Sequence, residues 1–334
     1  MKVRKPLLLA IFFFSAIATL MAACAPSAAP AVAPTAAPTS APAAAPTAAP
    51  TAAASQPIAT KPAEATKPVA AAAQAALDMK AVLDKYYSGL PEGFTAIQPA
   101  ALKDQIAAAK PFLVDVRETK EIADNGFIEG SVNIPIRTFA KNLDKLPGKD
   151  QPIVVACGSG HRSALGMMAL QLLGYSNVKS LAGGFGAWKA ANLPVATGKP
   201  ADPVAGKAPD VDKELLAALD KYLSNLPDGF SAISATALKD QLDAAKPFQI
   251  DVREAKEVAD NGYIAGSINV PIRGLIKNLD KLPQDKATAI IAECGSGHRS
   301  AMAMMGLNLL GYTNVKSLGG GFGAWKAANL PIAK

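Results

Sequence analysis

The sequence predicts an α/β chain made of two tandem copies of one domain, each a parallel sheet flanked by helices on both faces. The first observation is a duplication: residues from 83 onward recur from 219 onward, and segments 157–194 and 294–331 differ at only six positions. The second is that short apolar runs alternate with helical spacing inside each copy, as buried parallel strands and covering helices do. With 334 residues, 50% of them hydrophobic, the chain is long enough for two ordinary domains.

The elements of the first copy follow from these runs. Strands are predicted at the apolar runs 112–115, 153–155 and 178–181. Helical spacing marks the segments between and after them, at residues 100–109, 137–146 and 163–173. Gly174 ends the last helix, because glycine tolerates the left-handed backbone that follows a helix. The second copy repeats this order.

Each copy contains the heptapeptide Cys-Gly-Ser-Gly-His-Arg-Ser, at residues 157–163 and 294–300. An apolar run precedes it and helical spacing follows, so the cysteine stands at the end of a strand and just before a helix. Backbone N–H groups of such a loop and of a helix start favour negative charge. The adjacent His and Arg add positive potential, which stabilises a thiolate. Cys157 and Cys294 are therefore the predicted nucleophiles.

Four motifs, in the same order in both copies, resemble those of the rhodanese (sulfurtransferase) family. They are Asp-Val-Arg-Glu at 115–118 and 251–254, Gly-x-Ile-x-Gly-Ser-x-Asn-x-Pro at 126–135 and 262–271, the six-residue loop from Cys to Arg, and Gly-Gly-Phe-Gly-Ala-Trp at 183–188 and 320–325. The resemblance covers about residues 80–196 and 214–333 and implies two rhodanese-like domains. Many members carry Arg after the cysteine, where this chain has Gly158 and Gly295, and His where it has Phe127 and Tyr263.

The resemblance implies a sulfurtransferase. A cysteine thiolate attacks the sulfane sulfur of a small anionic donor such as thiosulfate, becomes a persulfide, and gives the sulfur to a thiol or cyanide acceptor. Arg162 and Arg299 are expected to bind the sulfonate of the donor, and Ser163 and Ser300 to cap the helix and donate to the persulfide. All loop residues are candidate substrate-binding residues: Gly158, Ser159, Gly160, His161, Arg162, Ser163, Gly295, Ser296, Gly297, His298, Arg299 and Ser300.

The sequence predicts no cofactor and no metal site, since the two histidines, one per loop, have no cysteine or acidic cluster of suitable spacing beside them. Whether the histidines supply positive potential or are ordinary loop residues stays open. Asp115 with Arg117, and Asp251 with Arg253, are expected to form structural ion pairs at strand ends.

Two other functions also stay open. One is a persulfide carrier or docking module that hands sulfur to a protein partner without catalysis. The other is a phosphatase or arsenate reductase, although those enzymes have a loop one residue longer.

The amino terminus predicts a location outside the cytoplasm. Lys2, Arg4 and Lys5 precede the apolar stretch 7–20, which ends in Met-Ala-Ala-Cys at 21–24. This order is typical of a secretory signal and resembles a bacterial lipoprotein signal in which Cys24 is lipidated and anchors the protein to the membrane, on the periplasmic or cell-surface side. An uncleaved membrane helix and ordinary secretion are the alternatives.

Between signal and domains lies a segment, residues 25–75, made almost wholly of Ala, Pro, Thr and Ser. It has no bulky side chains to bury and predicts an extended, disordered linker. The predicted boundaries are 1–23 (signal), 24–76 (linker), 77–196 (first domain), 197–213 (second linker) and 214–334 (second domain). The net charge of +7 falls to about +4 without the three amino-terminal charges, and no basic cluster suggests a nucleic-acid partner.

Overall fold

The computed structural model describes residues 77–334, which hold both repeats. The predicted signal, the first linker and Cys24 lie outside the described residues. Among the helices within residues 77–334, none is long and apolar enough to cross a membrane.

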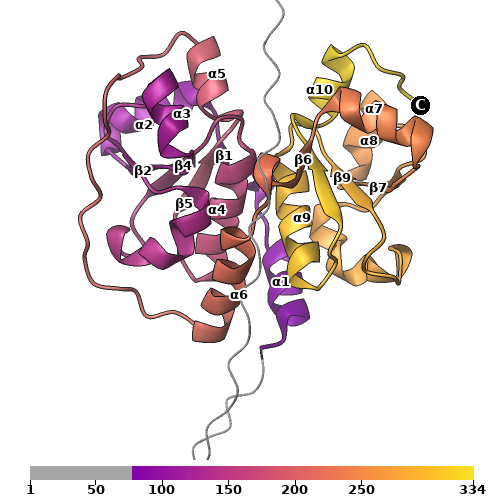
Figure 1. The fold of residues 1–334 in the computed structure, drawn as a ribbon, viewed down its shortest axis with the longest axis horizontal. Helices are drawn as coiled ribbons and strands as arrows, with labels where there is room; N and C mark the ends of the chain where they lie inside the picture. Colours follow the sequence, from indigo (N-terminus) through magenta and orange to yellow (C-terminus); the bar gives the residue numbers. More distant parts are fainter. Residues whose placement is uncertain (1–76) are drawn as a thin grey trace, which may run out of the picture. The chain divides into compact units, whose positions relative to one another are not determined.

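Each repeat contains a five-stranded sheet in which all neighbouring strands are parallel (Figure 1). The strand orders are β1-β5-β4-β2-β3 and β6-β10-β9-β7-β8. The strands of the first repeat are β1 (Ala96–Ile97), β2 (Phe112–Asp115), β3 (Ser131–Asn133), β4 (Ile153–Ala156) and β5 (Val178–Leu181). Those of the second are β6 (Ala232–Ile233), β7 (Phe248–Asp251), β8 (Ile268–Asn269), β9 (Ile290–Glu293) and β10 (Val315–Leu318). The predicted fold class is confirmed.

Helices surround both sheets. In the first repeat they are α1 (Met79–Ser88), α2 (Pro99–Ala109), α3 (Thr119–Asn125), α4 (His161–Leu172) and α5 (Gly184–Ala190), with the 3-10 segments η1 (Glu92–Thr95) and η2 (Ile136–Lys145). In the second they are α6 (Lys213–Ser224), α7 (Ala235–Ala244), α8 (Ala255–Asn261), α9 (His298–Leu309) and α10 (Gly321–Ala327), with η3 (Asp228–Ser231), η4 (Ile272–Gly274) and η5 (Ile276–Lys281).

Both faces of the first sheet are apolar, because successive strand residues point to opposite sides. Val114 and Val155 belong to the core under α4, whereas Leu113 and Val154 belong to the core that Leu102 of α2 and Trp188 of α5 complete. This two-sided burial is why the strands read as continuous apolar runs.

The predicted elements agree with the structure in most places. The strands at 112–115 and 178–181 have the predicted bounds, and β4 is one residue longer than predicted. The segment predicted as a helix at 137–146 is instead 3-10 helix, interrupted at Asn142, whose φ of −120° is not helical. The strands β1 and β3, of two and three residues, are too short to show a period in the sequence.

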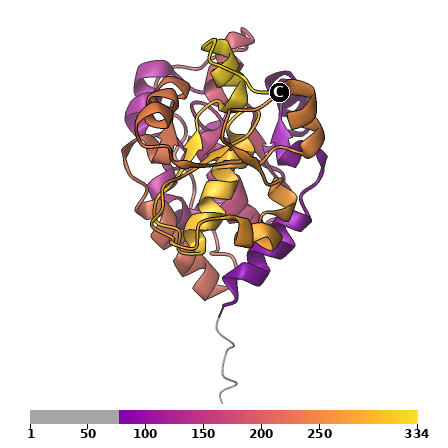
Figure 2. The ribbon, with the colours of Figure 1, turned by 90° about the vertical axis from the view of Figure 1, so that its right-hand side faces the viewer.

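The first helix of each repeat packs against the opposite repeat. α1 contacts η4 and η5, α6 contacts η2, and the loop helices α4 and α9 contact each other. Figure 1 shows α1 beside α9, and the turned view in Figure 2 shows the same helix against segments of the second repeat. The Tyr87 hydroxyl of α1 donates a hydrogen bond to the Met302 carbonyl oxygen of α9, at 2.8 Å. One hydrophobic core therefore contains side chains of both repeats.

Candidate active site

The cysteine loops lie where parallel sheets place their sites, at the carboxyl ends of the central strands β4 and β9. The Gly160 N–H donates a hydrogen bond to Cys157 Sγ at 3.2 Å, and Gly297 does the same to Cys294 Sγ at 3.2 Å. Gly160 has a φ of 91°, which a residue with a side chain rarely adopts. Because α4 and α9 begin one residue later, each sulfur faces a backbone N–H at a helix start. This arrangement favours negative charge on the sulfur, as the motif predicts.

The Gly-Gly-Phe-Gly segment holds the loop in this shape. The N–H groups of Phe185 and Gly186 donate to the carbonyl oxygens of Cys157 and Gly158, at 2.6 and 2.9 Å. A β-carbon at Gly184 would overlap the Cys157 carbonyl oxygen, so only glycine allows this approach. The contacts recur in the second repeat at residues 294, 295 and 321–323. The motif is thus a support for the cysteine loop.

Two buried serines stand behind each sulfur. The Cys157 thiol lies 3.4 Å from Ser163 Oγ, and the Ser180 hydroxyl donates to Ser163 Oγ at 2.8 Å. Ser163 is the third residue of α4, and Gly160 takes the N-cap position, so the prediction of a serine cap is wrong. Ser180 is not among the predicted site residues, although a serine in a buried strand is the signal that marks it. Ser300 and Ser317 repeat the pair at 2.8 Å.

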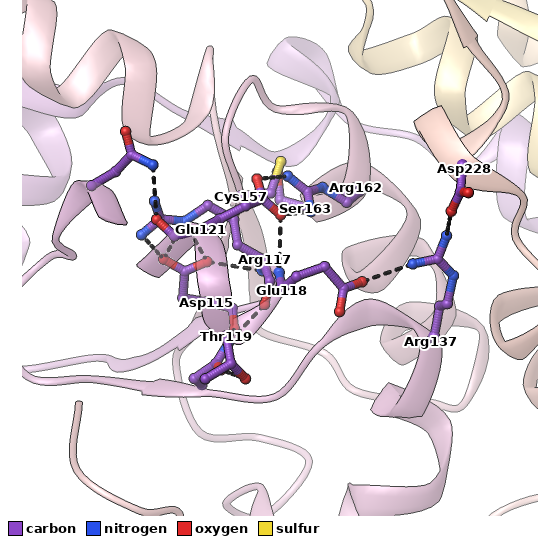
Figure 3. Close-up of polar contacts among 12 residues, drawn as sticks. Asp115, Arg117, Glu118, Thr119, Glu121, Arg137, Cys157, Arg162, Ser163 and Asp228 are labelled. Atoms are coloured by element: carbon purple, nitrogen blue, oxygen red, sulfur yellow. Dashed lines mark hydrogen bonds and ion pairs between the residues drawn. The ribbon is translucent and has the colours of Figure 1, made fainter. Parts of the chain in front are cut away.

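Arg162 is paired with a carboxylate of its own repeat (Figure 3). Its Nη1 and Nη2 donate to the two carboxylate oxygens of Glu121 at 2.5 and 2.6 Å. The hydrogen bond from Arg162 lowers the pKa of Glu121 below its ordinary value. Arg299 and Glu257 form the same pair. Sulfonate binding by these arginines stays a prediction, and any anion would meet a guanidinium that a carboxylate already orients.

Glu121 is also not among the residues that the sequence predicts for the site. Its signal is local: Glu118 and Glu121 form a capping box at the start of α3, three residues apart. One carboxylate therefore both caps α3 and orients the loop arginine.

The expected strand-end ion pair is confirmed. Arg117 Nη2 lies 2.6 Å from Asp115 Oδ2, both side chains are buried, and Nη2 also donates to the Gly126 carbonyl oxygen at 2.8 Å. The guanidinium carbon lies 4.2 Å from the centre of the Phe185 ring, on the helix that supports the cysteine loop. The pair, drawn in Figure 3, is structural, and the contact of Arg117 with Phe185 ties the end of β2 to α5.

The loop histidines are neutral near physiological pH. Burial lowers the pKa of His161, and likewise that of His298, to about 4. Of the two roles left open for the histidines, this favours the ordinary loop residue over the source of positive potential, because burial disfavours the charged ring. His161 Nε2 donates to the Phe230 carbonyl oxygen at 3.0 Å, and His298 Nε2 to that of Phe94 at 3.0 Å. Each histidine thus contacts the opposite repeat.

Both cysteines are free and almost fully buried. Within residues 77–334, no group of three or more His, Cys, Asp or Glu side chains is placed to hold a metal ion. The site contains a thiol with a backbone hydrogen-bond donor, a buried pair of hydroxyl groups and an oriented arginine. These groups suit a nucleophilic attack by the cysteine sulfur.

The chain is similar to known proteins. The sequence profile described as "Rhodanese-like domain" matches residues 98–191 and 234–328. Thiosulfate sulfurtransferase 16, chloroplastic, from Arabidopsis thaliana is 37% identical over 111 residues, which cover 30% of this chain and 91% of that protein. The 3-mercaptopyruvate sulfurtransferase of Mus musculus is 28% identical over 166 residues, which cover 46% of this chain and 54% of that protein. The chain thus spans about half the length of this mouse relative.

A solved structure completes the comparison. The crystal structure of SseA from Escherichia coli, described with the 3-mercaptopyruvate sulfotransferases, matches 68% of this chain and 98% of its own, with 20% identity and a TM-score of 0.35.

Proposed function

The chain belongs to the rhodanese-like family, and from that membership we propose that it moves sulfane sulfur through persulfides formed on both Cys157 and Cys294. The observation that carries the proposal is that neither loop has lost a part. Both have the backbone donor to sulfur, at 3.2 Å in each, and the same serine and arginine neighbours.

The first half-reaction forms the persulfide. The thiol proton leaves, and the thiolate attacks the outer sulfur of thiosulfate. The bond between the two donor sulfurs breaks, and its electron pair departs with sulfite. The Gly160 N–H stabilises the negative sulfur before and after this step. Ser163, which accepts a hydrogen bond from the thiol, is free to donate one to the anion while it accepts from Ser180.

The second half-reaction regenerates the cysteine. A thiolate or cyanide attacks the terminal sulfur of the persulfide, and the electron pair of the broken sulfur–sulfur bond returns to the cysteine sulfur. We propose that Arg162 and Arg299 attract the anionic end of the donor with the N–H groups that the glutamates leave unpaired. Thiosulfate and 3-mercaptopyruvate, for which the two relatives are named, both carry such an anionic end.

We propose further that Cys24 anchors the protein by a lipid on the outer side of a bacterial membrane. The order of the basic residues, the apolar stretch and Met-Ala-Ala-Cys supports this location. A Cys24→Ser protein should take up no labelled palmitate, whereas the unaltered chain should. An unaltered chain that stays unlabelled in a bacterial host would contradict the anchor.

Mass spectrometry after incubation with thiosulfate tests the sulfur chemistry. Each cysteine should gain the mass of one sulfur atom, and cyanide should remove it with formation of thiocyanate. Cys157→Ala and Cys294→Ala should each leave one working site, and the double variant none. Persulfides that form but do not turn over would favour the carrier alternative. No persulfide on either cysteine, with hydrolysis of an aryl phosphate instead, would favour a phosphatase.

A further inference from the structure

A short segment before the first strand of each repeat lies against the cysteine loop of the other repeat. We call these segments the first arm (residues 90–95, Leu-Pro-Glu-Gly-Phe-Thr) and the second arm (residues 226–231, Leu-Pro-Asp-Gly-Phe-Ser). Both precede the parts of the chain that match the family, which begin at residues 98 and 234. They therefore lie outside the residues that the family profile matches.

The second arm contacts the Cys157 loop through Phe230. Its carbonyl oxygen accepts the hydrogen bond from His161 Nε2 at 3.0 Å. Its ring lies over the guanidinium of Arg162, with 4.4 Å from Cζ to the ring centre. One residue of the second repeat thus holds two successive residues of the first active-site loop.

Arg137 of η2 binds the second arm and holds it against the Cys157 loop. Its Nε donates to the Leu226 carbonyl oxygen at 2.9 Å, and its Nη2 lies 3.2 Å from the Asp228 carboxylate (Figure 3). Its guanidinium stacks on the Phe230 ring as well, at 4.6 Å. On its other side Arg137 pairs with Glu118 at 2.9 Å, so the ring lies between two oriented arginines.

The first arm makes the same contacts at the Cys294 loop. The Phe94 carbonyl oxygen accepts from His298 at 3.0 Å, and the Phe94 ring lies 4.5 Å from both Arg299 Cζ and Arg273 Cζ. Arg273 Nε donates to the Leu90 carbonyl oxygen at 3.0 Å. The arrangement therefore occurs twice, except that, within residues 77–334, the ion pair of Arg137 with Asp228 has no counterpart between Arg273 and the first arm.

The backbone of the arms is strained where it meets the loops. Phe94 and Thr95 have φ values of 52° and 55°, and Phe230 and Ser231 both have 55°. Left-handed backbone is unfavourable for a residue with a side chain, and such residues cluster at functional sites. Two in succession persist only where the surroundings hold them.

We propose that each sulfur-transfer site is completed by the opposite repeat, with Phe230 and Phe94 as positioning residues for the donor. The inference rests on the proposed function. Each ring covers one face of the loop arginine and leaves accessible to an anion only those N–H groups that do not pair with the glutamate. Each arm carbonyl also fixes the histidine tautomer with hydrogen on Nε2. Without the ring, the arginine keeps its glutamate but loses the contact that fixes the face of its guanidinium, whereas the cysteine keeps its backbone support.

The test compares the two cysteines inside one molecule. Phe230→Leu and Phe94→Leu are made in the full chain, and persulfide formation from thiosulfate is followed on the Cys157 and Cys294 peptides by mass spectrometry. Phe230→Leu should slow loading of Cys157 relative to Cys294 roughly tenfold, the scale of a desolvated cation–π contact, and Phe94→Leu should do the reverse. Phe230→Tyr and Phe94→Tyr keep the ring and should restore the ratio.

Kinetics with a single working site supply a second readout. In the Cys294→Ala background, Phe230→Leu should raise the KM for thiosulfate more than it lowers kcat, since the ring acts on donor binding. A merely structural role would slow both cysteines together.

The outcomes distinguish a failure of the proposed function from a failure of the positioning role. If the unaltered chain forms no persulfide, the proposed function fails and the positioning role fails with it. If the unaltered chain loads both cysteines but the leucine variants slow both equally, or slow the cysteine of their own repeat, only the inference about the arms is overturned.

Discussion

Glu293 gives the second repeat a buried carboxyl group that the first repeat lacks. It is the last residue of β9, directly before Cys294, and its counterpart in the first repeat is Ala156. Its side chain is 1% exposed and neither carboxylate oxygen has a hydrogen-bond partner. The nearby Ser267 hydroxyl donates to the Ile264 carbonyl oxygen instead, at 2.9 Å. Burial, and then the charge of Asp251, raise the pKa of Glu293 to about 8.

The sign and size of the effect follow from this pKa. The ordinary value for the unfolded chain is 4.5, so the folded state holds its proton more tightly. Stability from this group is fully present below the unfolded pKa and is lost as pH rises toward the folded pKa. At about pH 7 the loss is on the order of 3 kcal/mol, since each pKa unit corresponds to about 1.4 kcal/mol.

Urea unfolding across this range measures the loss. Replacing the carboxyl by an uncharged amide of the same shape, in Glu293→Gln, should flatten the pH dependence between about pH 5 and about pH 8. The free energy of unfolding of the variant should therefore increase relative to that of the wild type as pH rises. Ala156→Glu is the matched control, because Asp115 and Arg117 reproduce the surroundings of Glu293 and should make the first repeat equally pH-sensitive. Parallel stability curves for wild type and Glu293→Gln would refute the reasoning.

Three further predictions concern the loops and the interface. Arg162→Ala with Arg299→Ala should cut thiosulfate turnover about tenfold to a hundredfold, the scale of hydrogen bonds to a charge, and affect an uncharged persulfide donor much less; equal losses for both donors would place the arginines in loop support. Gly184→Ala should displace the loop carbonyl and reduce persulfide formation on Cys157 only, as peptide mass spectrometry would show. Tyr87→Phe should lower the free energy of unfolding by about 1 kcal/mol in urea, and an unchanged value would mean that its buried hydrogen bond contributes nothing.

The fold and the nucleophiles can be predicted from the sequence because both depend on local patterns. Apolar runs locate β2, β4 and β5, and the heptapeptide places each cysteine between a strand and a helix. A continuous apolar run or a period of 3.6 residues can be recognised without knowledge of the partner element. The expectation for the strand-end pair Asp115–Arg117 holds for the same reason, since the two residues are neighbours in sequence.

The rest of the site depends on contacts between distant residues. Glu121 lies 41 residues from Arg162, and Phe230 lies 69 residues from His161. No local pattern links such pairs. The protonation state of the histidines also depends on distant residues. Burial against the opposite repeat and the core lowers the pKa of His161, so the ring is neutral. Such burial depends on tertiary packing and cannot be read from the local sequence.

The packing of Tyr87 on Gly306 affects whether the protein can tolerate exchange of sequence between its two repeats. A β-carbon at 306 would overlap the tyrosine hydroxyl, yet the corresponding residue of the first repeat is Ala169, and the counterpart of Tyr87 is Leu223. Glycine inside a helix costs about 1 kcal/mol against alanine, so its presence in α9 is explained by the ring it admits. Recombination within a gene can copy the coding segment of one repeat over the similar segment of the other. Such an event would bring alanine against Tyr87. Selection for a folded protein therefore opposes homogenisation of the halves at this interface, while it leaves the shared heptapeptide free to remain identical.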